Sequence, residues 1–150
     1  MRTLGIDFGE KRIGLAISDD AGRVAVPMET FERQTDRRAV YRIAALAREE
    51  EVKHLVLGEP RGLEDGLLGP AAERIRRFGA KLAKASRLPV TYVDESLTTV
   101  EAEHRLLEAG RDPRDRKELL DAVAAQILLQ QALDEGAQGE PSATPPEARD

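Results

Sequence analysis

The sequence predicts an α/β fold: a mixed five-stranded sheet flanked by helices. Two features of the 150-residue chain lead to this prediction. Three short strand-like runs follow one another at the amino-terminal end, and helical and strand-like segments then alternate. Strands joined by tight turns pair antiparallel, whereas strands separated by a helix run parallel. We therefore expect a three-strand antiparallel meander joined to two parallel strands.

The first three strands are predicted from side-chain alternation and from turn residues. Residues 3–8 alternate between large apolar side chains and small or polar ones, which is typical of a strand. A second run covers residues 13–18, and the segment 19–22 has the composition of a turn. A third run covers residues 23–28 and extends to Thr30. Links as short as these predict hairpins.

The rest of the chain alternates helices and strands. Apolar residues at helical spacing predict helices over residues 36–50, 71–85, 98–109 and 116–133. Short apolar runs at residues 54–57 and 90–93 predict buried parallel strands. Residues 60–70 are rich in glycine and proline and are expected to form a loop.

Composition predicts one domain followed by a tail. From Gly136 onward the chain consists largely of Gly, Pro, Ser, Ala and Glu, a composition typical of disorder. We expect a single domain over residues 1–134 and an acidic, disordered tail over residues 135–150. The segment 134–150 holds five acidic residues and one arginine, so it contributes most of the net charge of −5. The nearly neutral domain can then present a basic face beside an acidic pocket.

Composition also excludes several classes of protein. The chain has no cysteine, which rules out a disulfide framework, a thiolate metal site and a thiol nucleophile. No apolar run approaches the ~20 residues that a membrane helix needs. The charged residues within positions 1–18 do not match a secretory signal. We expect a cytoplasmic protein that does not contact a membrane.

Asp7 is the first candidate for chemistry. It lies inside the first predicted strand, between Ile6 and Phe8. A carboxylate inside a sheet is unfavourable unless it is paired with a cation or binds a metal ion. Two interpretations remain open. Asp7 lies either on a solvated sheet face or beside an arginine, or it belongs to a functional site, which we favour.

Asp94 and Glu95 directly follow the predicted strand 90–93. Ligand sites in open α/β sheets gather at the carboxyl ends of the strands. Adjacent side chains at a strand end point in different directions, so one can face the site while the other helps to begin the next helix. We favour Glu95 for the site and keep Asp94 as an additional candidate ligand.

Asp121 is the third candidate. Its neighbours three and four positions along the predicted helix are Ala124 and Ala125, so it lies on the apolar side of that helix. The alternative is an aspartate at the edge of the core, paired with Lys117. Three carboxylates suit Mg²⁺ or Mn²⁺, which prefer oxygen ligands and leave positions for water and phosphate. Such ions can promote hydrolysis of a phosphodiester bond.

Three blocks of the sequence, in this order, resemble signatures of the YqgF/RuvX family. They are residues 5–16 (GIDFGEKRIGLA), 94–99 (DESLTT) and 117–125 (KELLDAVAA). The resemblance implies a ribonuclease H-like fold, related to that of Holliday junction resolvases. It also implies that Asp7, Glu95 and Asp121 are the catalytic residues and the ligands of Mg²⁺ or Mn²⁺.

The same resemblance implies a function. The family is described both as nucleases that mature the 5′ end of pre-16S rRNA and as Holliday junction resolvases. We therefore expect a metal-dependent nuclease in ribosome biogenesis, with cleavage of branched DNA as the alternative. Its partner would be precursor rRNA or branched DNA. A resolvase needs two sites and favours a homodimer, whereas an exonuclease that trims RNA can act as a monomer.

One position departs from the family pattern. The loop after the strand 54–57 usually reads Gly-Leu-Pro in the family, but here it reads Gly58-Glu59-Pro60. Glu59 adds a carboxylate at another strand end. We expect it either to assist the metal site or to be exposed.

Basic residues near the carboxylates are the expected substrate contacts. We favour Lys11, Arg12 and Arg61, because their loops should border the acidic site. A basic stripe on the helix 71–85 is a weaker candidate, and its members are Arg74, Arg77, Lys81 and Lys84. Aromatic residues make up only 3% of the chain, so recognition of the nucleic-acid backbone is expected to outweigh base stacking.

Two other classes of function stay open. The segment Gly5–Gly9 followed by a hairpin also resembles the first phosphate loop of actin-like ATPases and sugar kinases. Those enzymes close two lobes on a nucleotide, and a chain of this length supplies one. The third class is a non-catalytic RNA-binding assembly factor, which would bind precursor RNA without cleaving it.

Overall fold

The computed structural model describes residues 1–60, 69–95 and 113–135, with the backbone alone over 113–119. Its elements, in chain order, are β1 (Thr3–Phe8), β2 (Arg12–Ser18), β3 (Ala25–Glu32), α1 (Asp36–Glu49), β4 (His54–Glu59), α2 (Pro70–Ser86), β5 (Val90–Asp94) and α4 (Pro113–Asp134). The helix predicted over residues 98–109 lies outside the described residues. No helix within the described ranges is long and apolar enough to cross a membrane.

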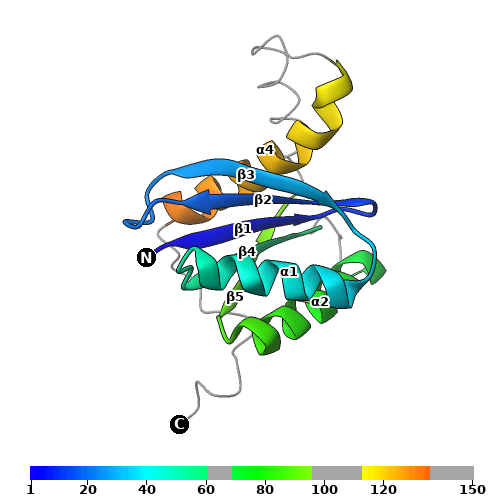
Figure 1. Cartoon of the computed structure of the whole chain (residues 1–150), viewed down its shortest axis with the longest axis horizontal. Coiled ribbons are helices and arrows are strands. Elements are labelled where there is room, and N and C mark those ends of the chain that lie inside the picture. The colour runs from blue at the N-terminus through cyan, green and yellow to red at the C-terminus, as the bar shows by residue number, and fades with distance from the viewer. Residues whose placement is uncertain (61–68, 96–112, 136–150) are drawn as a thin grey trace.

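The five strands form one mixed sheet in the order β3-β2-β1-β4-β5. β1 pairs antiparallel with β2, and β2 with β3, whereas the pairs β1–β4 and β4–β5 are parallel. The predicted meander with two parallel strands is therefore confirmed. β1 is the central strand, and the carboxyl ends of β1, β4 and β5 lie at the same edge of the sheet (Figure 1).

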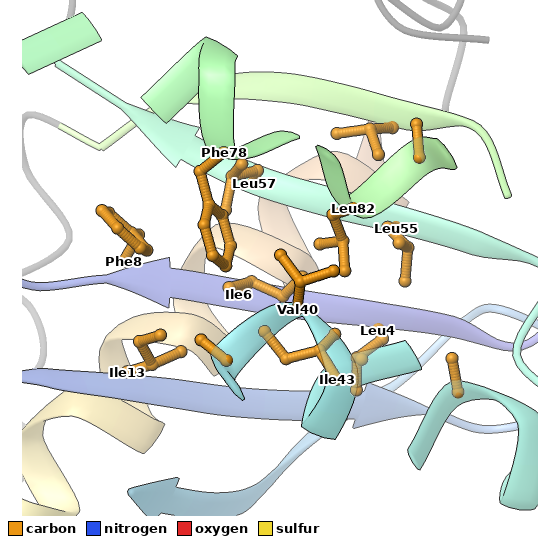
Figure 2. Packing of buried hydrophobic residues seen from close by; sticks show 14 of the residues in the cluster. Leu4, Ile6, Phe8, Ile13, Val40, Ile43, Leu55, Leu57, Phe78 and Leu82 are labelled. Carbon is orange, nitrogen blue, oxygen red and sulfur yellow. The ribbon is translucent and has the colours of Figure 1, made fainter. Parts of the chain in front are cut away.

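The main core lies between the sheet and the helices α1 and α2. Figure 2 labels some of its members, which are Leu4, Ile6, Phe8, Ile13, Val40, Ile43, Leu55, Leu57, Phe78 and Leu82. A smaller cluster on the other face packs α4 against the sheet through Ala125, Leu128 and Leu129. Successive strand residues point to opposite faces. Asp7 lies between two residues of the main core and therefore faces α4.

β4 extends two residues beyond its predicted end at Leu57. Gly58 and Glu59 continue the parallel pairing with β5 and are both buried. An apolar run could not reveal this extension, because neither residue is a large apolar one. The longer strand carries Glu59 to the same sheet edge as the end of β5.

Candidate active site

Asp7 lies in the central strand between two residues that have no side chain. On one side it pairs with Gly14 of β2. On the other side Ile6 pairs with Leu57 of β4, which puts Gly58 beside Asp7. Glycine in a strand interior often marks a close approach by another segment. Another segment of the chain approaches closely at each of the two glycines next to Asp7.

The clearance at Gly14 brings α4 onto the sheet. A Cβ atom at this position would overlap the backbone carbonyl of Asp121. Further along the helix, a Cβ atom on Gly5 of β1 would lie 2.7 Å from the Cβ atom of Leu129. The helix backbone therefore rests directly on β1 and β2. Because Gly14 is the pairing partner of Asp7, this contact places Asp121 close to Asp7.

The clearance at Gly58 accommodates Glu95. The backbone N–H of Glu95 donates to the carbonyl oxygen of Glu59 at 3.1 Å, which anchors the residue to the end of β4. A Cβ atom on Gly58 would lie 3.2 Å from the Oε2 atom of Glu95 and 3.3 Å from its Cβ atom. The side chain of Glu95 thus lies over Gly58, beside Asp7 on the face that α4 covers.

The charges of these carboxylates act on one another. Burial raises the pKa of Asp7 from 3.8 to about 7, with further contributions from the negative charges of Glu95 and Asp121. The pKa of Glu95 is also raised, first by burial and then by Asp94 and Glu59. A shift of this size through burial and like charges is a mark of a functional site. The structure therefore brings together the three carboxylates that the sequence singled out.

Arg12 supplies a positive charge at this cluster. Its Nε atom donates to the Oδ2 atom of Asp121 at 2.9 Å, and both side chains are partly exposed. Asp121 is therefore paired with a basic residue that lies 109 positions away in the sequence. Lys117 itself lies among the residues whose side chains the structure leaves undescribed.

Three carboxylates supply only oxygen ligands, which are the ligands that hard divalent cations prefer. The ligand atoms of this cluster therefore suit such a cation. Within the described residues, no three His, Asp or Glu side chains already surround a common point. The ion pair with Arg12 explains part of this, since it holds one oxygen of Asp121. A cation would bind Asp121 either through its other oxygen or in place of Arg12.

The surroundings of Glu59 contradict one of the two expectations for this residue. Its side chain is fully buried, so the expectation of an exposed residue is wrong. Both carboxylate oxygens accept from Arg76 of α2, each at 2.8 Å. The Arg76 guanidinium also stacks over the Tyr92 ring at 4.7 Å, and the Tyr92 hydroxyl donates to the Arg76 carbonyl at 3.3 Å. Glu59 is thus bound in a buried ion pair with Arg76, and its negative charge contributes to the raised pKa of Glu95.

Sequence reasoning missed Arg76 and the two glycines. The signal for Arg76 was present in the sequence. It shares a side of α2 with the small buried residues Ala72, Gly79 and Ala83 and not with the exposed basic stripe. No such signal existed for Gly14 and Gly58, because only the packed partner shows what the absent Cβ atom makes room for.

Where the structure describes them, the other expected substrate contacts and candidate ligands are exposed. Lys11 is exposed on the hairpin between β1 and β2, and its carbonyl oxygen accepts from the backbone N–H of Arg33 at 2.8 Å. Asp94 is exposed at the end of β5. Arg61 lies outside the described residues. The four members of the basic stripe on α2 are all exposed.

The sequence model of the RuvX family, described as Holliday junction resolvase, matches residues 1–135. The chain belongs to the RuvX family. One relative of this RuvX protein, from Crocosphaera subtropica, is named "Putative pre-16S rRNA nuclease". It is 43% identical over 132 residues, which cover 88% of this chain and 92% of the relative. A second relative with the same name, from Syntrophus aciditrophicus, is 43% identical over 134 residues, which cover 89% of each chain.

Solved structures agree with the fold of this RuvX protein. A T. thermophilus RuvC in complex with a Holliday junction substrate superposes with a TM-score of 0.59 at 16% identity, covering 94% of this chain and 99% of the other. The fowlpox virus Holliday junction resolvase gives a TM-score of 0.53 at 17% identity, with coverage of 91% and 99%. The predicted family, the ribonuclease H-like fold and the assignment to the nucleases are confirmed.

Proposed function

We propose that this protein is a divalent-metal-dependent nuclease whose active site consists of Asp7, Glu95 and Asp121. One observation carries the proposal: three separate elements deliver these carboxylates to one place, and glycines beside Asp7 make the approach possible. Mutual repulsion among buried carboxylates destabilises a folded protein, and it is typical of sites that bind cations.

Mg²⁺ or Mn²⁺ is the cofactor that we propose, held by the three carboxylates. Bound there, such an ion activates water and stabilises the leaving oxygen of a phosphodiester bond. Asp7 is the most fixed ligand because it belongs to the central strand. Asp94 remains a candidate for an additional ligand, since it is next to Glu95 and exposed, whereas Glu59 is bound to Arg76.

Arg12, Lys11 and Arg61 are the substrate contacts that we propose. A cation that took the place of Arg12 at Asp121 would free the guanidinium to bind a phosphate group through two parallel hydrogen bonds. Lys11 directly precedes Arg12 on the same hairpin and is exposed. Contacts of this kind hold the phosphate backbone without reading sequence, and they weaken as salt increases.

The substrate that we propose is the 5′ end of precursor 16S rRNA, cleaved in the cytoplasm. Relatives that share more than 40% of their residues with this chain over most of their length carry that description. The alternative is branched DNA, which the family description and the likeness to the solved resolvases favour. Resolution of a junction requires two cuts and hence a homodimer, whereas RNA trimming requires one site.

Cleavage assays with the purified protein test the proposal. The substrates are precursor 16S rRNA with its 5′ extension and a synthetic four-way DNA junction, each with Mg²⁺, with Mn²⁺ and with a chelator. We expect metal-dependent removal of the RNA extension by the wild type and none by Asp7→Asn. Cleavage of the junction alone would move the assignment to the resolvase alternative. Binding of RNA without cleavage under every condition would contradict a nuclease and point to an assembly factor.

A further inference from the structure

Tyr41 on α1 is an aromatic side chain that the fold does not bury. It is 78% exposed, the largest exposed fraction of any large apolar side chain among the described residues. The other aromatic residues of the chain lie in the core or, in the case of Phe31, beneath the Arg42 guanidinium at 4.7 Å. An exposed aromatic ring offers a flat apolar face on which a nucleobase can stack.

Tyr41 and Arg38 together separate two hollows on the surface of α1. The smaller hollow has a volume of about 360 Å³ and is lined by Thr35, Arg37, Arg38 and Tyr41. The larger one has a volume of about 720 Å³ and lies between α1 and the edge strand β3, with Phe31 and Leu46 in its wall. The Tyr41 ring therefore lies between a small hollow with mainly apolar walls and a wider hollow with mixed polar and apolar walls.

The two hollows differ in charge. The smaller one is lined by two arginines and no acidic residue. In the larger one Arg42 is already paired with Glu29 of β3, and two further glutamates, Glu32 and Glu49, line the wall. Positive charge is therefore concentrated at Arg37 and Arg38, next to the ring, and the Arg38 side chain is held in place by the Gln34 side chain at 2.6 Å.

A continuous stretch of chain joins a contact of the β1–β2 hairpin to the Tyr41 helix. The backbone N–H of Arg33 donates to the Lys11 carbonyl on the β1–β2 hairpin, and the Arg33 Nη1 atom donates to the Gly9 carbonyl at 3.2 Å. The chain then turns round the edge of the sheet into α1 (Figure 1), whose first turn is capped by Thr35. From Arg33 to Tyr41 this stretch carries the basic residues Arg33, Arg37 and Arg38 and the acidic residue Asp36.

We propose that Arg37, Arg38 and Tyr41, here called the Tyr41 ridge, bind the single-stranded flank of the nucleic acid that the site cleaves. One base stacks on the Tyr41 ring, and the neighbouring phosphates contact the two arginines. This rests on the proposed function. A symmetric contact between two copies fits the ridge less well, because it would bring the same arginines of both copies face to face.

Binding measurements without divalent metal, so that nothing is cleaved, test the Tyr41 ridge. The probes are a fluorescent RNA duplex with blunt ends and the same duplex with a single-stranded extension of roughly ten nucleotides, within the site sizes of single-strand grooves. We expect the wild type to prefer the extended probe. Tyr41→Ala should weaken binding of the extended probe about fivefold or more while leaving the blunt duplex unchanged, and Tyr41→Phe should retain binding.

Two arginines of the same helix provide a matched control. Arg38→Ala and Arg48→Ala each remove one exposed positive charge from α1, but Arg48 lies in the last turn, away from the ridge. Only Arg38→Ala should reduce the preference for the extended probe. Equal losses in both variants would show a general effect of charge and overturn the proposal.

The outcomes separate this proposal from the proposed function. If the wild type cleaves nucleic acid but Tyr41→Ala binds the extended probe with wild-type affinity, the ridge proposal is wrong and the nuclease assignment stands. If the wild type neither binds nor cleaves any nucleic acid, both are wrong. If Tyr41→Ala changes only the mass of the particle in sedimentation, the ridge is a contact between copies and the proposal is overturned.

Discussion

Asp7 combines a fixed position with an unfavourable electrostatic environment. Its backbone is held in the central strand by neighbours on both sides, and its partly buried carboxylate lies near two others. The folded chain therefore holds a proton on Asp7 at a pH where the unfolded chain has released it. A divalent cation would remove this penalty, which explains why an otherwise unfavourable residue is compatible with a stable fold.

The raised pKa of Asp7 predicts a specific dependence of stability on pH. Because the folded pKa is about 7 and the unfolded value 3.8, stability should fall as pH rises between these values. Asp7→Asn should remove that loss. In a chelator, the gain in unfolding free energy from Asp7→Asn should be larger at about pH 8 than at about pH 5, by roughly 2–4 kcal/mol. Urea denaturation of both proteins measures this, and a gain that is independent of pH would contradict the environment assigned to Asp7.

Glu59 and Arg76 allow a test of the buried ion pair. Arg76→Met leaves a fully buried carboxylate without its partner and should destabilise the protein by about 3 kcal/mol. The double variant Glu59→Leu with Arg76→Met removes both charges and should recover most of that loss. Arg77→Met, an exposed neighbour on the same helix, is the control and should change stability little. A double variant no more stable than Arg76→Met would show that the pair is not a self-contained unit.

At the scale of elements, the position of α4 determines whether a site exists. The helix reaches β1 and β2 only because Gly5 and Gly14 present no Cβ atom to its backbone. Its apolar cluster with the sheet then fixes the helix along its length. Asp121 is held near Asp7 by this packing more than by its pairing with Arg12, which is partly exposed.

Gly14→Ala therefore tests the helix contact. The added Cβ atom would overlap the helix backbone at Asp121, so α4 must shift, which should destabilise the fold by about 1–3 kcal/mol and strongly reduce metal-dependent cleavage. Val40→Ala is the control, because it weakens the core on the opposite face of the sheet by a comparable amount. If both variants lost cleavage equally, the loss would reflect stability alone and the role given to Gly14 would be wrong.

The sequence predicted those features of the structure that depend on a single strand, helix or turn. Alternation in residues 3–8 predicted β1 and the place of Asp7 inside it, and the turn residues predicted the meander. It was not informative where two distant elements meet. The contact of Arg12 with Asp121 and that of Glu59 with Arg76 join separate elements, and a glycine within a strand pattern does not reveal what packs on it. The residue types of the site were therefore predictable, whereas their supporting contacts were not.

At the scale of the molecule, the sheet carries helices on both faces, and the proposed active site lies on the α4 face at the carboxyl ends of β1, β4 and β5. The Tyr41 ridge lies on α1, which covers the opposite face of the sheet from α4. Because the core under α1 and α2 and the acidic residues lie on opposite faces of the sheet, this core stabilises the fold without including those residues. The last described helix ends at Asp134, and the family match ends at residue 135.

Deletion of residues 136–150 tests the proposed domain boundary. The composition of this segment offers too few apolar groups to offset the entropy of ordering it. Thermal unfolding and cleavage should both remain unchanged. Binding of nucleic acid should become slightly tighter, because the deletion removes three acidic residues and one arginine. A marked drop in melting temperature would show that the segment belongs to the folded domain.

Binding of Mn²⁺ to the purified protein, followed by titration calorimetry, tests the central claim most directly. The wild type should bind Mn²⁺, and Asp7→Asn, Glu95→Gln and Asp121→Asn should each weaken binding strongly while their folds stay intact by circular dichroism. Arg12→Ala should bind at least as tightly as the wild type, because the ion no longer competes with the guanidinium for Asp121. If Asp7→Asn bound Mn²⁺ with wild-type affinity, the three carboxylates would not form the metal site and the account would be contradicted.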